Sequence, residues 1–209
     1  MQKELIILTK SAKINGFCVA GIDIENGQWI RLVSDNENGE GAVSLIDLTY
    51  EDGTEAQIFD LVSVECFPAA TEVQSENFLY DKQSCWKKIR TVSPEEAFNN
   101  CPLNNSPYIF NNTERALDEN GINGESLMLA EIDNIVINVV CEYNKTKWRV
   151  NFEYNGFVYN NISVGDIHIR NICKEYRAYP LQGKHIAVFS LTGKFERTGK
   201  YYKMLAQLF

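Results

Sequence analysis

The alternation of apolar and polar residues is clearest in the second half of the chain. Residues 127–142 are rich in β-branched side chains and predict one long strand, bulged near Asp133-Asn134. Residues 148–154 alternate strictly, which is typical of a half-buried strand whose apolar face holds Trp148, Val150, Phe152 and Tyr154. Asn155-Gly156 then predicts a tight hairpin turn, because both positions tolerate a positive φ. A third strand, Phe157 to Val164, completes a meander.

A helical period begins at Asp166. Four residues with spacing i, i+3, i+4 and i+7 predict a helix over about 166–177, with an apolar face formed by Ile169, Ile172, Cys173 and Tyr176. Asp166 can cap this helix, and Pro180 prevents it from continuing. Two more strands follow, His185 to Leu191 and Tyr201 to Leu208. This order of elements is that of an OB barrel, a five-stranded Greek-key barrel with a helix after the third strand.

The first part of the chain predicts a looser version of the same plan. Its five expected strands are Glu4–Thr9, Phe17–Ile24, Gln28–Val33, Leu45–Tyr50 and Gln57–Cys66. Turn residues at 25–27 and 52–53 separate the second strand from the third and the fourth from the fifth. A polar loop, Ser34 to Gly41, stands where the helix of an OB barrel would be.

Residues 68–124 show weaker periodicity. Ser93-Pro94-Glu95-Glu96 predicts the start of a short helix that must end by Pro102. Asparagine, proline and glycine indicate loops over the rest. We therefore expect three parts: a first OB-like module at 1–67, a connecting segment at 68–124, and a second OB-like module at 125–209. The predicted fold class is mainly β, with two OB-like five-stranded barrels, an elaborated connecting segment and few short helices.

Charge divides the chain unevenly. The formal net charge is −8, which argues against broad attraction to nucleic acid or to anionic membranes. Residues 1–124 hold 9 Lys/Arg and 20 Asp/Glu, whereas residues 125–209 hold 11 Lys/Arg and 8 Asp/Glu. A polyanionic partner should therefore prefer the second part.

Several kinds of protein are disfavoured by what the sequence lacks. The first residues contain only a short apolar run, and no stretch approaches the ~20 apolar residues of a membrane span, so we expect a cytoplasmic protein without a membrane partner. Six scattered cysteines and two histidines form no metal-ligand spacing, so we expect no metal and no cofactor. No nucleophile–base motif is present, so we name no catalytic residue and do not expect an enzyme.

Several ordered motifs carry a family resemblance. They are Thr9-Lys10-Ser11-Ala12-Lys13, Gly16-Phe17-Cys18-Val19-Ala20-Gly21, Gln28-Trp29-Ile30-Arg31-Leu32-Val33-Ser34, Phe59-Asp60-Leu61-Val62-Ser63-Val64, Trp148 to Asp166, Phe189-Ser190-Leu191 and Tyr202-Lys203-Met204-Leu205-Ala206. Together they resemble bacterial dual OB-fold (DuOB-type) domain proteins over most of the chain. The resemblance implies two OB barrels and a module that recognises nucleic acid or nucleotides.

Candidate binding residues in the first module follow two strand ends. Lys10, Ser11 and Lys13 end one strand, and Arg31 and Ser34 end another. Cations beside hydroxyl groups would suit a phosphate or a carboxylate, because Arg offers a planar fork and Ser a short donor. The alternative is that these are solvated strand ends with a structural salt bridge.

Candidate residues in the second module lie on its meander. OB modules bind single strands by stacking bases on aromatic side chains beside a basic groove, which would assign Lys147, Arg149, Phe157 and Tyr159. Phe157 and Tyr159 are the candidates for base stacking if the hairpin places them outward, whereas the alternating face of residues 148–154 is more typical of the barrel core.

Three functions are weighed on these grounds. The leading hypothesis is a ligand-recognition module for single-stranded nucleic acid or a nucleotide, without catalytic activity of its own. The second is a protein-interaction or adaptor domain whose acidic first half contacts a basic partner protein. The third, an enzyme acting on a nucleotide, has the least support from the sequence.

Overall fold

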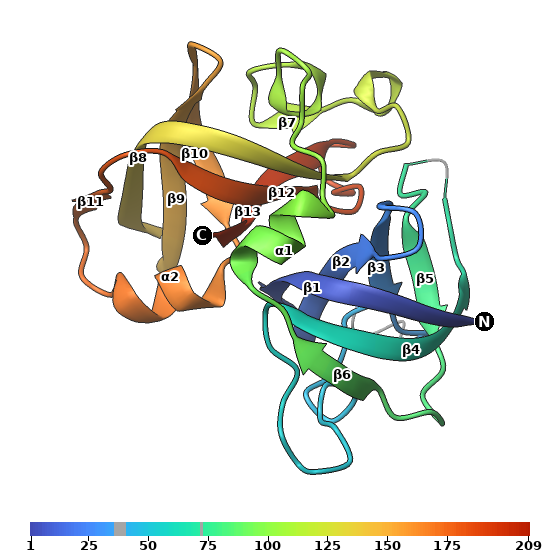
Figure 1. Cartoon of the computed structure of the whole chain (residues 1–209). Helices are drawn as coiled ribbons and strands as arrows, with labels where there is room; N and C mark the ends of the chain where they lie inside the picture. Colours follow the sequence, from blue (N-terminus) through green and yellow to red (C-terminus); the bar gives the residue numbers. More distant parts are fainter. Residues whose placement is uncertain (36–40, 72) are drawn as a thin grey trace. The chain divides into compact units, whose positions relative to one another are not determined.

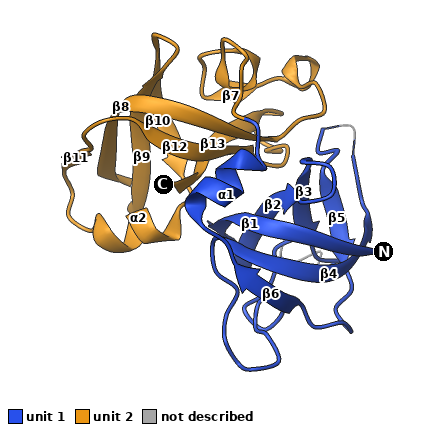
Figure 2. Cartoon of the chain, viewed as in Figure 1, with its two compact units in different colours: residues 1–102 blue, residues 103–209 orange. Residues whose placement is uncertain are grey.

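The structure, a computed structural model, describes residues 1–35, 41–71 and 73–209, with 51% of the protein in strands and 9% in helices. It divides into two units, Met1–Pro102 and Leu103–Phe209, each of which contains one closed five-stranded barrel (Figure 2). The predicted fold class, mainly β with two OB-like barrels and few short helices, is confirmed.

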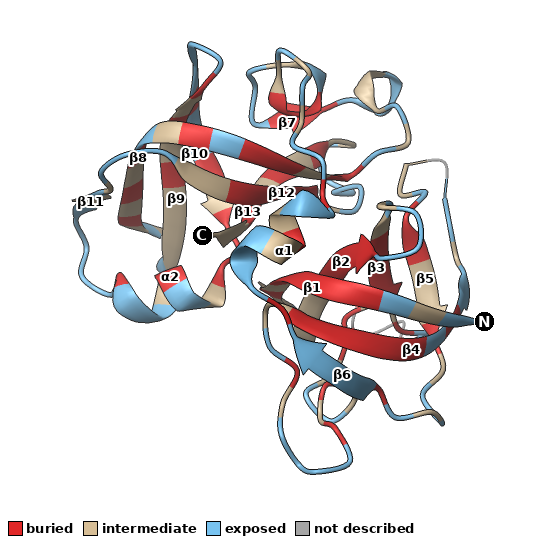
Figure 3. Cartoon of the chain, viewed as in Figure 1, coloured by how far each residue is buried: buried red, intermediate tan, exposed pale blue. Residues whose placement is uncertain are grey.

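Unit 1 is built from β1 (Gln2–Lys13), β2 (Gly16–Asp23), β3 (Trp29–Val33), β4 (Asp60–Pro68), β5 (Asn77–Tyr80), β6 (Lys87–Thr91) and α1 (Pro94–Asn99) (Figure 1). Its sheet has the order β1-β2-β3-β5-β4-β6, and a second pairing of β4 with β1 closes the first five strands into a barrel. The β3–β5 pair is parallel, as in an OB barrel. The sixth strand, β6, lies beside β4 and is exposed along its whole length (Figure 3).

One strand predicted for this unit is wrong. Residues 45–50 form turns, in which Leu45 and Ile46 are 52% and 83% exposed, while Leu48 is buried. The Ser44 side chain accepts a hydrogen bond from the Asp47 backbone N–H, which stabilises a turn instead of a strand. Along the chain, the fourth strand of the barrel is β4, which corresponds to the predicted fifth strand, Gln57–Cys66. The fifth strand is β5, which was not predicted. The expected polar loop at Ser34 to Gly41 lies mostly outside the described residues.

Unit 2 contains β7 (Ala116–Leu117), β8 (Leu127–Glu142), β9 (Lys145–Tyr154), β10 (Phe157–Val164), α2 (Ile167–Ile172), β11 (Ala178–Pro180), β12 (His185–Leu191) and β13 (Tyr201–Leu208), with 3-10 turns η2 (Ile109–Asn111) and η3 (Glu119–Gly121). Its order β10-β9-β8-β12-β13 closes through a parallel β10–β13 pair. Because α2 follows the third barrel strand, this unit has the predicted OB order.

The local predictions for this barrel hold with one change. The register of β8 shifts between Asp133 and Val136, and Asn155 and Gly156 have φ values of 52° and 77°. Asp166 caps α2 by accepting from the Ile169 backbone N–H at 3.1 Å. The helix ends at Ile172, however, and not near 177. Of its predicted apolar face, Ile169 and Cys173 pack in the core, whereas Ile172 and Tyr176 are 61% and 64% exposed.

The segment between the predicted modules belongs to both units. Residues 68–102 supply β5, β6 and α1 to unit 1, and α1 begins as predicted with the Ser93 side chain accepting from the Glu96 backbone N–H. Residues 103–117 enter unit 2, where Ile109 and Phe110 join the barrel core. The observed boundary at 102/103 thus differs from the expected boundaries at 67/68 and 124/125. We call residues 103–112 the plug segment.

Candidate ligand-binding face of the second barrel

The candidate cations of unit 1 are already engaged within the protein. Arg31 is 3% exposed and forms an ion pair with Glu76 at 3.1 Å and a hydrogen bond to Asn77 Oδ1 at 3.2 Å. Lys10 donates to Glu55 at 2.9 Å and to the Ala56 carbonyl at 2.9 Å. These contacts match the structural salt bridges that the sequence left open as the alternative.

The other candidates of unit 1 are only partly brought together. Ser11 pairs with Cys18 and Arg31 pairs with Ala20, so Ser11 and Arg31 share one face of the sheet, on either side of β2. Ser11 is 1% exposed, and Ser34 donates to the Ala42 carbonyl at 2.8 Å. Lys13 is half-buried at the end of β1. Among the described residues of unit 1, these candidates therefore do not form an accessible cluster of cations.

In unit 2 a row of polar side chains crosses the outer face of the barrel. Arg149 on β9 pairs with Asn138 on β8 and with Ser163 on β10. The neighbouring positions Val150 and Phe152 are buried in the core, which confirms that this alternating strand has an inward apolar face. Because side chains alternate across a strand, Arg149 and Lys147 lie on the outside.

Arg149 is the centre of this row. Its Nη1 donates to Ser163 Oγ at 2.5 Å, and its Nε and Nη2 donate to the two carboxylate oxygens of Glu142 at 3.2 and 2.5 Å. The hydrogen bonds from Arg149, together with the positive charges of Arg115 and Lys147, hold the pKa of Glu142 below its usual value. We call Arg115, Glu142, Lys147, Arg149 and Ser163 the Arg149 cluster.

Three members of the Arg149 cluster were not named from the sequence: Glu142, which ends the predicted long strand, Ser163 and Arg115. The tight turn at 155–156 would place Ile162 opposite Arg149, but a register shift between Tyr159 and Ile162 places Ser163 there instead. Asn161 has a φ of 62° at this bulge. Arg115 comes from the segment that the sequence assigned to a connection, and no periodicity connects it with β9.

The aromatic candidates have different positions. Phe157 is 38% exposed, and its ring lies 4.8 Å from that of Tyr108 in the plug segment. Tyr159 is fully buried and stacks on Phe152 with ring centroids 4.9 Å apart. The hairpin therefore does not place Tyr159 outward, as its role in base stacking would require, because it pairs Tyr159 directly with Phe152 and paired residues share one face of a sheet.

A buried lysine beneath the plug segment was also missed. Lys203 is 1% exposed, and its Nζ donates to the Asn112 backbone and side-chain oxygens at 2.5 and 2.8 Å and lies 5.1 Å from the centre of the Tyr159 ring. Burial lowers the pKa of Lys203 to about 7, against a small opposing effect of Glu114. Its position inside the barrel assigns it to holding the plug segment.

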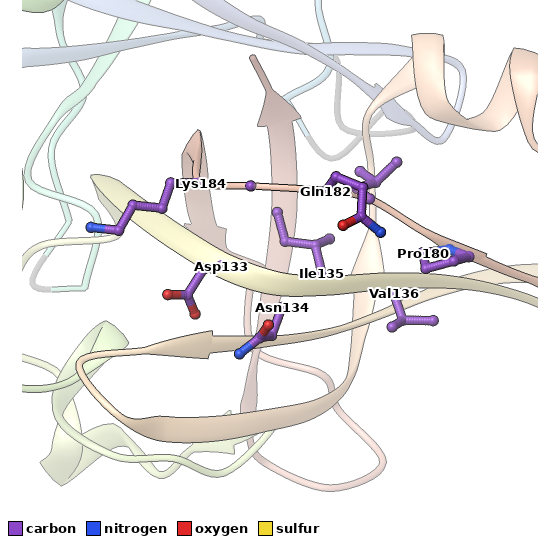
Figure 4. A pocket seen from close by; sticks show the side chains of 9 residues that line it. Asp133, Asn134, Ile135, Val136, Pro180, Gln182 and Lys184 are labelled. Atoms are coloured by element: carbon purple, nitrogen blue, oxygen red, sulfur yellow. The ribbon is translucent and has the colours of Figure 1, made fainter.

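A shallow pocket of about 420 Å³ lies at the bulge of β8 (Figure 4). Asp133 and Asn134 line it from β8, and Gln182 and Lys184 line it from the segment before β12. Asn134 donates to Glu153 and Lys184 to Glu131, so two of the polar side chains that line this pocket already have partners.

The residues that the structure describes offer no group of three or more His, Cys, Asp or Glu side chains able to hold a metal ion. Both ring nitrogens of His185 contact backbone carbonyl oxygens, those of Phe209 and Gln182, and His168 is exposed. In the described part of the chain, no helix is long and apolar enough to cross a membrane.

Comparison with known proteins gives one match. The family model described as the dual OB-containing domain matches residues 3–208, almost the whole chain. No curated protein and no solved structure matches this sequence.

Proposed function

This chain belongs to the dual OB-containing domain family, and on that premise we propose that it is a binding module that recognises single-stranded nucleic acid or nucleotides through the outer face of its second barrel. OB barrels bind such ligands on the face of their second and third strands, which in unit 2 are β9 and β10. The Arg149 cluster lies on that face. We propose no catalytic activity for the protein itself.

The observation that carries this proposal is the excess of cations in the Arg149 cluster. Arg115 and Lys147 have no ion pair or side-chain hydrogen bond among residues 1–35, 41–71 and 73–209. Cations without partners are available to phosphate groups, which provide most of the affinity of nucleic-acid complexes. Phe157 at the edge of the same hairpin offers a ring for base stacking. All six cysteines are free thiols, which suits the cytoplasm, where we place this activity.

We expect the double substitution Arg115→Ala and Lys147→Ala to weaken binding of single-stranded RNA or DNA. Neither side chain supports the fold through a described contact, so stability should be preserved. Loss of two phosphate contacts should lower the affinity roughly tenfold or more at low salt and reduce the slope of log K against log salt by about two. Fluorescence anisotropy with a labelled oligonucleotide over a salt series measures both quantities.

The matched control is Lys174→Ala with Lys184→Ala, which removes the same charge from unit 2 outside the Arg149 cluster. It should leave the salt slope close to that of the wild type. Absence of any oligonucleotide binding by the wild type at low salt would exclude the proposed function, because phosphate contacts are strongest there.

A second candidate function follows from unit 1. Residues 1–102 carry 17 Asp/Glu and 8 Lys/Arg, and six of those cations form ion pairs in the described structure. The remaining acidic excess would attract a basic partner protein, as an adaptor domain requires. Co-purification from the native cell tests this function: a stoichiometric basic partner that is released by salt supports it, and recovery of the chain alone argues against it.

A further inference from the structure

The contact between Arg149 and Glu142 has the geometry of an occupied phosphate site. Nε and Nη2 of the guanidinium face the two carboxylate oxygens of Glu142, while Nη1 is held by Ser163 Oγ. A planar guanidinium fork binds two oxygens of a phosphate group in the same side-on manner. The carboxylate of Glu142 therefore stands where two phosphate oxygens would bind.

The charges around this contact exceed what a structural ion pair requires. Arg149 alone neutralises Glu142, yet Arg115 and Lys147 also act on that carboxylate. These two residues come from different segments, the chain before β7 and strand β9. Lys147 and Arg149 stand two residues apart on the outer face of β9, and like charges placed in this way repel one another in the absence of a further anion. A phosphate group has more acceptor oxygens than a carboxylate, so it can accept from the Arg149 fork and from Lys147 at the same time.

Glu142 can leave this position at low cost. Its side chain is 30% exposed, against 12% for Arg149, so the carboxylate lies on the solvent side of the contact. Glu142 ends β8, and the turn that follows begins with Tyr143, which is 94% exposed. Rotation of the Glu142 side chain into water would leave Arg149 still held by Ser163. The fork would then be preformed for an incoming anion.

We infer that Arg149, Ser163 and Lys147 form a site for one phosphate group, and that Glu142 occupies this site in the free protein and competes with the ligand. The inference rests on the proposed function and adds its regulation: each binding event exchanges an internal carboxylate for a ligand phosphate. Glu142 thereby limits the affinity for any polyanion and reserves the site for ligands whose other contacts offset the exchange.

The test is Glu142→Gln, which keeps the size of the side chain and removes its negative charge. Affinity for a single-stranded oligonucleotide should rise roughly tenfold at low salt, the size of one charge-assisted hydrogen bond regained by the ligand. The matched control is Glu153→Gln, which removes the same charge from the neighbouring strand β9, at a residue that contacts Asn134 instead of Arg149. Equal gains in the two variants would show a general charge effect and overturn the inference.

Titrations with three ligands show which kind of phosphate binds. They also test the phosphate site separately from the proposed binding of nucleic acid. Inorganic phosphate, a nucleoside monophosphate and an oligonucleotide are titrated into wild type, Glu142→Gln and the double variant Glu142→Gln with Arg149→Lys. Tighter binding of inorganic phosphate by Glu142→Gln, lost in the double variant, supports the phosphate site even if no oligonucleotide binds. Oligonucleotide binding that is the same in wild type and Glu142→Gln sinks the phosphate site but leaves the proposed function intact.

Discussion

Replacing Asp60 with alanine is expected to destabilise unit 1 by roughly 3–5 kcal/mol. Asp60 is 1% exposed, and its carboxylate accepts hydrogen bonds from Tyr50 Oη at 3.0 Å, from the Gln57 backbone N–H at 3.0 Å and from Thr91 Oγ1 at 2.9 Å, with Lys88 Nζ at 2.7 Å. Alanine would remove the acceptor that these four groups share. The loss would loosen β6 from β4 and the 50–57 turns from the barrel.

The free energy of unfolding at acid pH gives a second test of the role of Asp60. Burial alone would raise the pKa of this carboxyl, but hydrogen bonds from Lys88, Gln57, Thr91 and Tyr50 hold it below the ordinary 3.8. A carboxyl with a lowered pKa contributes stability that is complete above 3.8 and disappears as the pH falls through the folded-state pKa. The difference between wild type and Asp60→Ala should therefore narrow below about pH 4.

Unfolding of the two units can be followed separately through the three tryptophans. Trp29 and Trp86 lie in unit 1 and Trp148 lies in unit 2, so fluorotryptophan labelling and fluorine NMR report each unit in the intact chain. Asp35→Ala is the control, since it breaks an exposed ion pair with Lys82 that should be worth ~0–1 kcal/mol. An Asp60→Ala variant as stable as this control would show that Asp60 does not support the barrel.

The second large effect concerns Lys203. Its folded-state pKa of about 7 lies below the ordinary 10.5, so between these values the unfolded chain binds more protons than the folded one. The free energy of unfolding of unit 2 should therefore rise with pH in this window, by up to ~1.4 kcal/mol for each pH unit. Lys203→Met should lack this rise, because methionine has no group that titrates.

The measurement is the difference between wild type and Lys203→Met, since other groups titrate equally in both proteins. Trp148 reports unit 2 at each pH. Lys200→Met is the control, because Lys200 is 40% exposed, forms an ion pair with Asp118 and lies beside the same strand. Parallel pH curves for wild type and Lys203→Met would mean that Lys203 keeps an ordinary pKa inside the barrel.

Sequence patterns predicted the elements whose spacing extends over several residues. The alternation of 148–154, the hairpin at Asn155-Gly156 and the cap at Asp166 each have a local physical cause, and all three are present in the structure. β5 has only four residues, too few to display a period, and it completes its barrel through a parallel pair with β3 that no local pattern encodes. The strand predicted at Leu45–Tyr50 was wrong because a run of apolar residues can also form a turn, in which two of them are exposed.

The candidate site was predicted in part. Lys147 and Arg149 belong to the observed cluster because strand parity alone places them outside the barrel. Predicting Ser163 would have required knowledge of the bulge at Asn161, and predicting Arg115 would have required the path of a loop. Neither feature follows from the spacing of residues. Lys203 did leave a signal in the sequence: it stands between Tyr201 and Leu205 on the inward side of a strand, where a lysine is unusual.

Closure of the second barrel by β13 has a consequence for the newborn chain. The ribosome releases β8, β9 and β10 first, while Met204 and Leu205, which pair with Ser163 and Val164, are made roughly two to eight seconds later at ordinary rates of translation. During that delay the inward side chains of the meander have no cover, and Asn112 has not yet met Lys203. This nascent intermediate is therefore the stage at which chaperones would engage the chain and at which slowed translation would promote aggregation.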